Sequence, residues 1–449
     1  MTPLDARDVK DRYVADFRAF VENGAGAAPA WLKQIREGAI ARFAELGFPT
    51  TKQEEWRFTS VAPIAETRFA LAAAETPPAP LPLPSGPALQ PFLLGAVTGP
   101  RVVFVDGRYA PGLSAIAGLP RGVQVGGLSA ALRAGPSGEL AQRHLARYAR
   151  WQHSAFAALN TAFLADGAFI YIPADTLVEP LLEVLFLATG HGGEGPTVSH
   201  PRSLIVLERG ARAAVVESYG ALADEVYWTN AVTEIVLGEG ARAEHYRVQR
   251  EGGRAYHVAT THSQQGRDSF LGLHVITLGG SLARHDLDTV LDGAGAELVL
   301  NGLYLLARTQ HADHHTVIEH AQPHCASHEF FNGVLDERAH GVFNGRIIVR
   351  PGAQRTDSKQ TNNNLLLSPD ARADSQPQLE IYADDVKCTH GSTVGPLDQT
   401  ALYYLRSRGL SPEAARSLLT YGFAAEILGR MERSDVRDRL DRMVRARLA

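Results

Sequence analysis

The feature that most constrains this chain is a long segment without helical periodicity. From Asp166 to Gly395, more than two hundred residues, short apolar and β-branched runs such as SLIVLERG, TEIVLGEG and GRIIVR alternate with glycine-containing turns. The letters Gly-Ala-Arg-Ala occur at 210 and again at 240, and Gly-Ala-Gly-Ala follows at 293. A repeated corner and strand is typical of a β-solenoid, whose coils bury a core only when they are stacked. An antiparallel sandwich or barrel with similar turns is the alternative.

Helical patterns flank this β segment and divide the chain into four predicted regions. Residues 1–95 form an N-terminal helical region that ends in a linker with seven prolines within fifteen residues. Residues 96–165 mix short strands with one helical stretch. Residues 166–395 are the β region, and residues 396–449 are a C-terminal helical module.

Two helix starts are predicted from capping residues. Thr51 and Glu54 have the spacing of a capping box, so we expect a helical turn to begin there. Further along, Ser411 is a favourable cap and Pro412 suits the first position of the helix that follows.

Composition excludes several classes of protein. A net charge of −5 and an isoelectric point near 6.4 argue against a nucleic-acid-binding protein. The charged start MTPLDARDVKDRY is no secretory signal, and no apolar run reaches the ~20 residues that span a bilayer. We therefore expect a cytoplasmic protein that does not bind membranes. The sequence has no Gly-Lys pair and hence no phosphate loop, so we expect this chain to bind no nucleotide.

The candidate site lies in the stretch IYADDVKCTHGSTVG at residues 381–395. Alternation along a strand places Cys388 and His390 on one face, together with Tyr382, Asp384 and Val386. The pair could be a nucleophile with its base, although no third group or oxyanion site is evident nearby. It could be half of a metal or iron–sulfur site, with the remaining ligands supplied from elsewhere. It could also be structural, because free cysteine is among the most buried residue types.

A second cluster, residues 311–328, contains six of the seventeen histidines and the other cysteine, Cys325. These spacings match neither a zinc finger nor the H-E-x-x-H pattern. We expect the histidines to be distributed over both faces of their strands and to be satisfied by backbone groups. The function of this stretch stays open at this point.

Several segments in a fixed order resemble the SufB/SufD family of iron–sulfur cluster assembly proteins. They are KQEEWRFT, ALNTAFLADGAFIYIP, VFNGRIIVRPGAQRTDSKQTNNNLLLSPDA, PQLEIYADDVKCTHGSTVG and LYYLRSRGLSPEAARSLLTYGFAAEIL. The resemblance covers most of the chain and is strongest from about 285 to 428. Within the family it favours the SufD branch, because Leu405 occupies the position where SufB-like chains carry a cysteine.

The resemblance implies a mainly β fold, a right-handed parallel β-helix between N-terminal and C-terminal helical regions. It implies a non-enzymatic scaffold subunit of an ATP-coupled assembly complex of the SufBCD type. A SufB-like paralogue would pair with this chain, a SufC-like ATPase would dock on its C-terminal helices, and a homodimer would form if the chain is alone. Cys388 and His390 would lie near the interface where an iron–sulfur cluster forms transiently, as ligands shared with the partner.

Two other functions are consistent with parts of the sequence. A β-helix carbohydrate-active enzyme would need paired Asp or Glu residues on one solenoid face and usually an export signal. A cysteine hydrolase would be built on Cys388 and His390. Activity on a polysaccharide and labelling by a thiol-directed acylating probe distinguish these functions from a scaffold.

Overall fold

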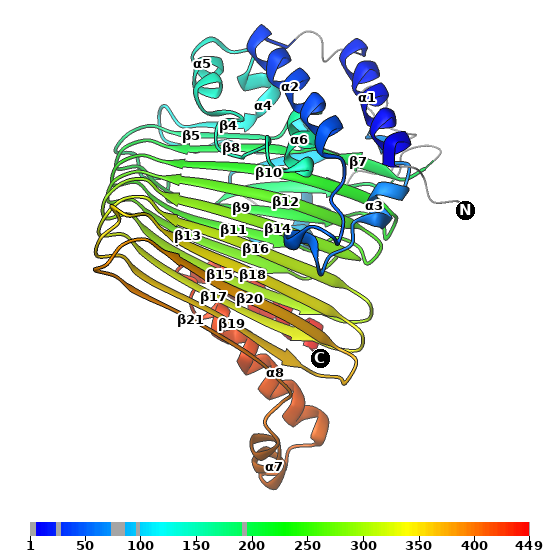
Figure 1. Cartoon of the computed structure of the whole chain (residues 1–449), viewed down its shortest axis with the longest axis vertical. Helices are drawn as coiled ribbons and strands as arrows, with labels where there is room; N and C mark the ends of the chain where they lie inside the picture. Colours follow the sequence, from blue (N-terminus) through cyan, green and yellow to red (C-terminus); the bar gives the residue numbers. More distant parts are fainter. Residues whose placement is uncertain (1–5, 24–27, 73–85, 96–98, 191–194, 449) are drawn as a thin grey trace.

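The protein is described here by a computed structural model covering residues 6–23, 28–72, 86–95, 99–190 and 195–448. Its centre is a parallel β-solenoid, with helices at the N-terminal and C-terminal sides (Figure 1). The predicted parallel β-helix is therefore confirmed, and the sandwich and barrel alternatives are wrong. Most of the proline-rich stretch lies outside the described residues, and its last part, Gly86–Phe92, is a 3-10 helix (η3) instead of an irregular linker.

The solenoid consists of two sheets, and the chain passes from one to the other at each half-coil. Sheet A runs in the order β20 (Arg372–Ile381), β18 (His340–Val349), β16 (His311–His320), β14 (Leu282–Leu291), β12 (Tyr256–Gln265), β10 (Tyr227–Leu237), β8 (Arg202–Leu207), β5 (Ala168–Ile172) and β4 (Gln124–Gly127), with β7 (Thr197–Ser199) and β1 (Ala70–Leu71) beside this path. Sheet B runs in the order β21 (Lys387–Gly395), β19 (Asp357–Leu366), β17 (Ala326–Leu335), β15 (Glu297–Leu306), β13 (Phe270–Thr277), β11 (Arg242–Gln249), β9 (Arg212–Ala221), β6 (Leu182–Ala188), β2 (Arg101–Val105) and β3 (Arg108–Tyr109).

The helices form two groups. The N-terminal group comprises α1 (Ala6–Glu22), α2 (Ala30–Leu46), η2 (Glu54–Trp56), α3 (Ala62–Glu66), η4 (Pro111–Leu113), α4 (Leu128–Ala131), α5 (Gly135–His144) and α6 (Ala155–Ala162). The C-terminal group comprises α7 (Gln399–Ser407), α8 (Pro412–Leu428) and α9 (Ser434–Leu448).

The capping predictions had different outcomes. Ser411 caps α8 as expected, since its side chain accepts a hydrogen bond from the backbone of Ala414. A helical turn does form before Trp56, but its cap position is Gln53 and no side chain caps it, so the predicted capping box at Thr51 is wrong.

One corner of the solenoid has the same backbone conformation on six successive coils. A residue with positive φ precedes a small, fully buried residue, and only Gly accepts that conformation without strain. The positive-φ residues are Gly210, Gly240, Asp268, Gly295, His324 and Arg355, followed by Ala211, Ala241, Ser269, Ala296, Cys325 and Thr356. The Gly-Ala repeat at 210 and 240 thus marks real corners. The third corner with these letters begins at Gly295, two residues after the position suggested by the sequence.

The interior of the solenoid is built from side chains that repeat from coil to coil. One interior row of sheet B contains Val215, His245, Leu273, Leu300, Glu329, Gln360 and His390. A parallel ladder in register places each of these residues directly against the next, with about 4.8 Å between strands. Most interior positions are apolar, but polar residues are also buried there, both in the middle coils, as at Arg247, and in the last ones, as at Gln360.

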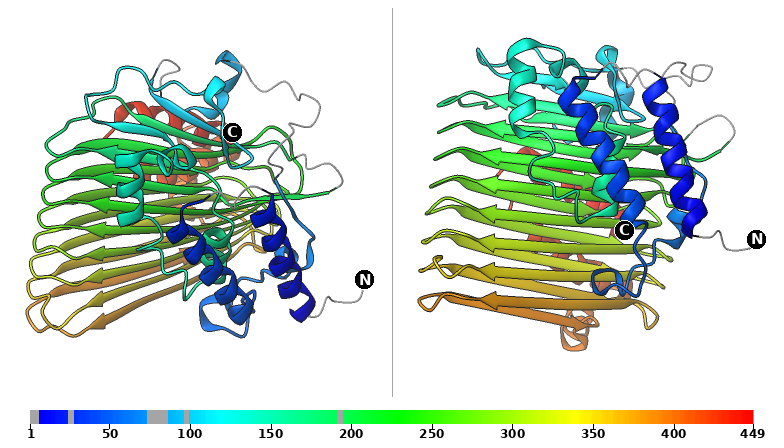
Figure 2. Two further views of the ribbon diagram at one scale, coloured as in Figure 1. Left: turned by 90° about the horizontal axis from the view of Figure 1, so that it is seen from above. Right: turned by 45° about the horizontal axis from the view of Figure 1, so that its top comes forward.

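The N-terminal helices other than η4 cover the outer face of sheet A, on the opposite side from the C-terminal helices (Figure 2). Phe48 and Phe156 pack their rings against Trp228 of β10, which is fully buried. The KQEEWRFT motif extends this cover, because the guanidinium of Arg284 lies 3.6 Å from the ring centre of Trp56 and donates to the backbone oxygen of Glu55.

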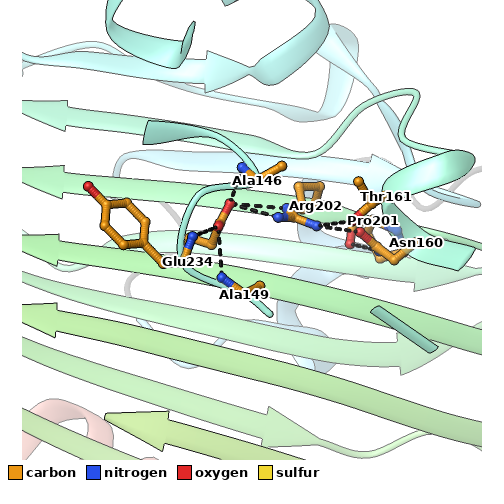
Figure 3. Close-up of polar contacts among 8 residues, drawn as sticks. Ala146, Ala149, Asn160, Thr161, Pro201, Arg202 and Glu234 are labelled. Atoms are coloured by element: carbon orange, nitrogen blue, oxygen red, sulfur yellow. Dashed lines mark hydrogen bonds and ion pairs between the residues drawn. The ribbon is translucent and has the colours of Figure 1, made fainter. Parts of the chain in front are cut away.

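A buried ion pair fixes the segment before α6 to the solenoid (Figure 3). Arg202 of β8 and Glu234 of β10 approach to 2.8 Å, and both side chains are 0% exposed. Glu234 also accepts hydrogen bonds from the backbone of Ala146 and Ala149, while Arg202 donates to the side chain of Asn160. Burial alone would raise the pKa of Glu234, but the charge of Arg202 and these hydrogen bonds hold it below its ordinary value. The carboxylate is therefore ionised in the fold.

The two ends of the solenoid differ. At the N-terminal end each sheet finishes with a short reversed strand, β4 antiparallel to β5 and β3 antiparallel to β2. At the C-terminal end each sheet finishes with a full-length parallel strand, β20 or β21, and no further strand of the described residues pairs with it (Figure 1). This open end carries the residues that the sequence predicts to be functional.

Candidate functional site

Cys388 and His390 lie on β21, the last strand of sheet B. They pair in register with Ser358 and Gln360 of β19, so they share one face as predicted. The rest of the predicted face is wrong. The chain leaves sheet A after Ile381 and turns before Lys387, so Tyr382, Asp384 and Val386 belong to that turn and not to the strand.

The shared face of the pair is the interior face of the solenoid. Ser358 and Gln360 are at most 1% exposed, and Cys388 and His390 continue their two interior rows by one coil. Because β21 is the outermost strand, His390 is exposed, whereas Cys388 is half-buried against the interior apolar cluster. The pair is therefore accessible only through the open end of the solenoid.

The thiol of Cys388 is not activated in the chain alone. Burial and the nearby carboxylate of Asp357 raise its pKa above the ordinary value. A protonated thiol is a poor nucleophile, which disfavours the hydrolase hypothesis. A metal ion would displace the proton on binding, so the same thiol is suited to being a ligand.

The pair supplies two donors of different chemistry, a sulfur that prefers soft metals and an imidazole that also binds iron. In the part of the chain that the structure describes, no group of three or more His, Cys, Asp or Glu side chains could hold a metal ion. A complete four-ligand site would thus need donors from another chain.

Two family models match nearly the whole chain. The SufBD protein N-terminal region matches residues 8–184, and the SufBD core domain of the SUF system for iron–sulfur cluster assembly matches residues 186–423. The chain belongs to the SufBD family. The resemblance predicted from its sequence motifs is therefore confirmed.

Curated relatives of this SufBD chain agree with the family models. An iron–sulfur cluster assembly SufBD family protein of Synechocystis sp. is 34% identical over 433 residues, which cover 94% of this chain and 92% of the relative. The iron–sulfur cluster assembly protein SufD of Escherichia coli is 31% identical over 393 residues, 86% of each chain. SufD of Bacillus subtilis is 28% identical over 290 residues, 63% of this chain and 64% of the relative.

Among the residues with described positions, no helix is both long and apolar enough to cross a bilayer.

Two polar residues beneath His390 were not predicted from the sequence. Gln360 is the interior neighbour of His390, and Glu329 is the next residue in that row. Gln360 Nε2 donates to Glu329 Oε2 at 2.6 Å, and burial raises the pKa of Glu329 to about 7. Intervals of about thirty residues, from 329 to 360 to 390, are the sequence signal that could have found this row.

A second polar row lies beneath Cys388. Ser358 shares a hydrogen bond of 2.7 Å with Ser327, which in turn lies 2.8 Å from His320 Nε2. All three side chains are buried. The SufBD chain therefore places polar groups under both residues of the pair, where the earlier coils have mostly apolar ones.

The histidines of residues 311–328 do not form a site. As predicted, they are distributed over both faces, with His314 and His320 inside and His311, His315 and His328 outside. The prediction that backbone groups satisfy them is wrong, because their hydrogen bonds and ion pairs are to side chains. The partners are Thr59 for His311, Thr277 for His314, Asp313 for His315 and Ser327 for His320.

Cys325 has a structural explanation. It is the small buried residue of one solenoid corner, directly after His324, and its thiol donates to the backbone oxygen of Gly293. The two cysteines therefore have different surroundings, and only Cys388 lies at the open end.

A second exposed surface lies on the C-terminal helices. Helix α7 has no buried residue, and Tyr403 and Tyr404 are 74% and 56% exposed. A groove runs beside it between the end of β19 and the start of α8, and we call it the α7 groove. It is lined by Leu366, Leu367, Pro396, Leu397, Gln399, Leu402, Tyr403, Arg406, Pro412 and Arg416.

Proposed function

We propose that this SufBD chain is a non-enzymatic scaffold subunit of an ATP-coupled iron–sulfur cluster assembly complex. It pairs with a SufB-like paralogue, and the cluster is a transient cargo built between the two chains. The observation that carries this proposal is the position of Cys388 and His390, side by side on the uncovered last coil. There they provide two of the four donors that a cluster usually takes, and a partner provides the others.

The open end also supports a strand-to-strand interface. In the part of the chain that the structure describes, no strand lies beside the outer edges of β20 and β21, and such edges readily pair with another chain. Apolar side chains next to them are unusually exposed, with Ile381 at 40%, Tyr382 at 58% and Val394 at 49%. A SufB-like paralogue covers this end in the complex, and a second copy of this chain covers it when the paralogue is absent.

The α7 groove is the proposed docking surface of a SufC-like ATPase. Exposed tyrosines beside an apolar groove and the arginine Arg406 are the residue types that dominate the energy of protein interfaces. The ATPase binds and hydrolyses the nucleotide.

The test is co-expression of the three chains, with the tag on this one, followed by anaerobic purification. We expect the paralogue and the ATPase to co-purify and the complex to contain iron and sulfide. Failure of the paralogue to co-purify would refute the pairing. Equal iron and sulfide in a complex that lacks both the Cys388 thiol and the His390 imidazole would refute the role of the open end. Mass determination of the chain alone tests self-pairing.

A further inference from the structure

The buried amide of Gln360 is held in one orientation directly under His390. The two residues are register partners on adjacent strands, and Gln360 is 0% exposed. Its nitrogen, Nε2, is engaged by the carboxyl group of Glu329 at 2.6 Å. The two polar atoms of an amide point in different directions, so Oε1 is not directed at the carboxyl oxygen to which Nε2 donates.

The opposite wall of the solenoid restricts the same amide. Gly345 of β18 lies against it, and a Cβ atom at that position would come within 2.3 Å of Gln360 Nε2 and 2.8 Å of its Cδ. The space that a side chain would fill in sheet A is thus occupied by the amide from sheet B. Gln360 is clamped between Glu329 and the backbone of Gly345.

Gln360 Oε1 has no hydrogen-bond partner among the described residues, although it is buried. An unsatisfied buried acceptor is unfavourable, so in a well-packed fold such an atom is expected to find a donor. The nearest coil towards the open end presents the imidazole of His390 on the same interior row. Neutral imidazole has one N–H donor and one lone pair.

No hydrogen bond joins Gln360 to His390 in this structure. We propose that Gln360 is a positioning residue for His390: the exposed ring turns onto the amide, whose oxygen accepts the ring N–H, so that the other ring nitrogen presents its lone pair at the open end. Histidines that bind metals usually donate their second nitrogen to a carbonyl or carboxylate, which fixes the tautomer and the ring orientation. The Glu329–Gln360 pair performs this task from inside the solenoid. The orientation of the His390 ring does not depend on the proposed function. Only the use of its lone pair as a ligand of the cluster rests on that function.

The test measures the tautomer of His390 in the full-length chain without partners. Histidine labelled with 15N is observed by NMR at pH 8, where imidazole is mostly neutral, and His390→Asn identifies the signal among seventeen histidines. A single fixed tautomer gives widely separated shifts for the two ring nitrogens, and a mixture brings them together. We expect wide separation in the unaltered chain and a reduced separation in Gln360→Met, which keeps the volume but loses the acceptor.

Three further variants make this test specific. Gln360→Glu restores an acceptor oxygen and should restore the separation. Gly345→Ala displaces the amide without altering Gln360, so it should reproduce the effect of Gln360→Met. It also provides the test if Gln360→Met folds poorly. Ser358→Ala is the matched control, since it lies on the same strand and face under Cys388 and should leave His390 unchanged.

The proposal is overturned if the unaltered chain already shows a tautomer mixture, if Gln360→Met keeps the single tautomer, or if Ser358→Ala has an equal effect. In the three-chain complex, Gln360→Met should lower iron and sulfide severalfold with both partners still bound. Failure of the proposed function is distinguishable, because loss of His390 would then leave the cluster yield unchanged whatever the NMR spectra of the free chain show.

Discussion

The hydroxyl of Ser392 donates to the hydroxyl of Ser375 at 2.9 Å and joins the last strand of sheet B to the last strand of sheet A. This contact crosses the solenoid interior two residues after His390. It helps to hold the terminal coil in shape although no further coil covers it. The candidate site is thus built on two connected strands, and single changes at its exposed side chains should affect chemistry more than folding.

Loss of the imidazole at the open end should impair cluster formation. We expect His390→Ala to lower iron and sulfide in the three-chain complex by roughly tenfold, and Cys388→Ala to lower them less, because in the proposed complex the paralogue supplies other thiols. Circular dichroism and partner capture should be unchanged for both. Thr389→Ala is the matched control, since Thr389 lies between them on the outer face. If His390→Ala unfolds the chain, the pair is structural.

Docking of the ATPase should depend on the α7 groove. Tyr403→Ala removes a side chain that is 74% exposed in the free chain, and as a hot-spot tyrosine it should weaken ATPase binding by about 2 kcal/mol, roughly thirtyfold. Calorimetric titration of the ATPase measures this. Tyr382→Ala alters another exposed tyrosine, at the open end, and should leave ATPase affinity intact. Unchanged binding by the Tyr403 variant would place the docking surface elsewhere.

Point variants are preferable here to truncation after Thr400. Helices α8 and α9 bury Ile427, Leu428 and Leu440 in the apolar cluster on the outer face of sheet B. Their removal would expose that face. We therefore expect a chain truncated after Thr400 to have a destabilised β region.

The Arg202–Glu234 ion pair should be critical for stability. Glu234→Gln removes one charge and leaves Arg202 buried without a counterion, which should cost about 3–5 kcal/mol in the free energy of unfolding. Urea denaturation followed by fluorescence measures the change. The exposed pair Arg209–Asp175 has a similar separation, 2.6 Å, and Asp175→Asn should cost under about 1 kcal/mol. Equal losses in the two variants would contradict this account.

Glu329 should make stability depend on pH. Its pKa is 4.5 in the unfolded chain and about 7 in the fold, so between these values the folded state holds a proton that the unfolded chain has lost. The stability that this bound proton gives the folded state is complete below about pH 4.5 and is lost as the pH rises to 7. Glu329→Gln should therefore gain about 3 kcal/mol relative to the unaltered chain between pH 4.5 and 8.

Parallel urea titrations at several pH values measure this difference. Glu432→Gln, at an exposed position, controls for the removal of one carboxylate. A constant difference between Glu329→Gln and the unaltered chain across this range would show that the carboxyl group of Glu329 ionises normally in the fold.

The solenoid could be predicted because its signals are local. Glycine tolerates the left-handed corner and alanine fits behind it, so Gly210–Ala211 and Gly240–Ala241 carry the repeat in their letters. The same corner at His324 and Arg355 has no such signal, since neighbouring coils impose the conformation on residues that do not prefer it. At these two positions the packing within the stack, and not the residue type, determines the left-handed backbone conformation.

The candidate site was predictable only in part. Alternation along one strand is enough to place Cys388 beside His390. The positions of Glu329 and Gln360 depend on the register between coils of unequal length, which no single segment of sequence contains. The extent of β21 was also not predictable, because the turn after Ile381 is set by where the preceding coil ends.

The contrast between the two ends of the solenoid limits how many chains can join. The strands at the N-terminal end are short and reversed, so they offer no ladder for addition, whereas β20 and β21 offer two full ones. Two chains that meet through their open ends use up both free edges at once. In the proposed complex such a union would be self-terminating, because neither chain would keep a free full-length edge for a third.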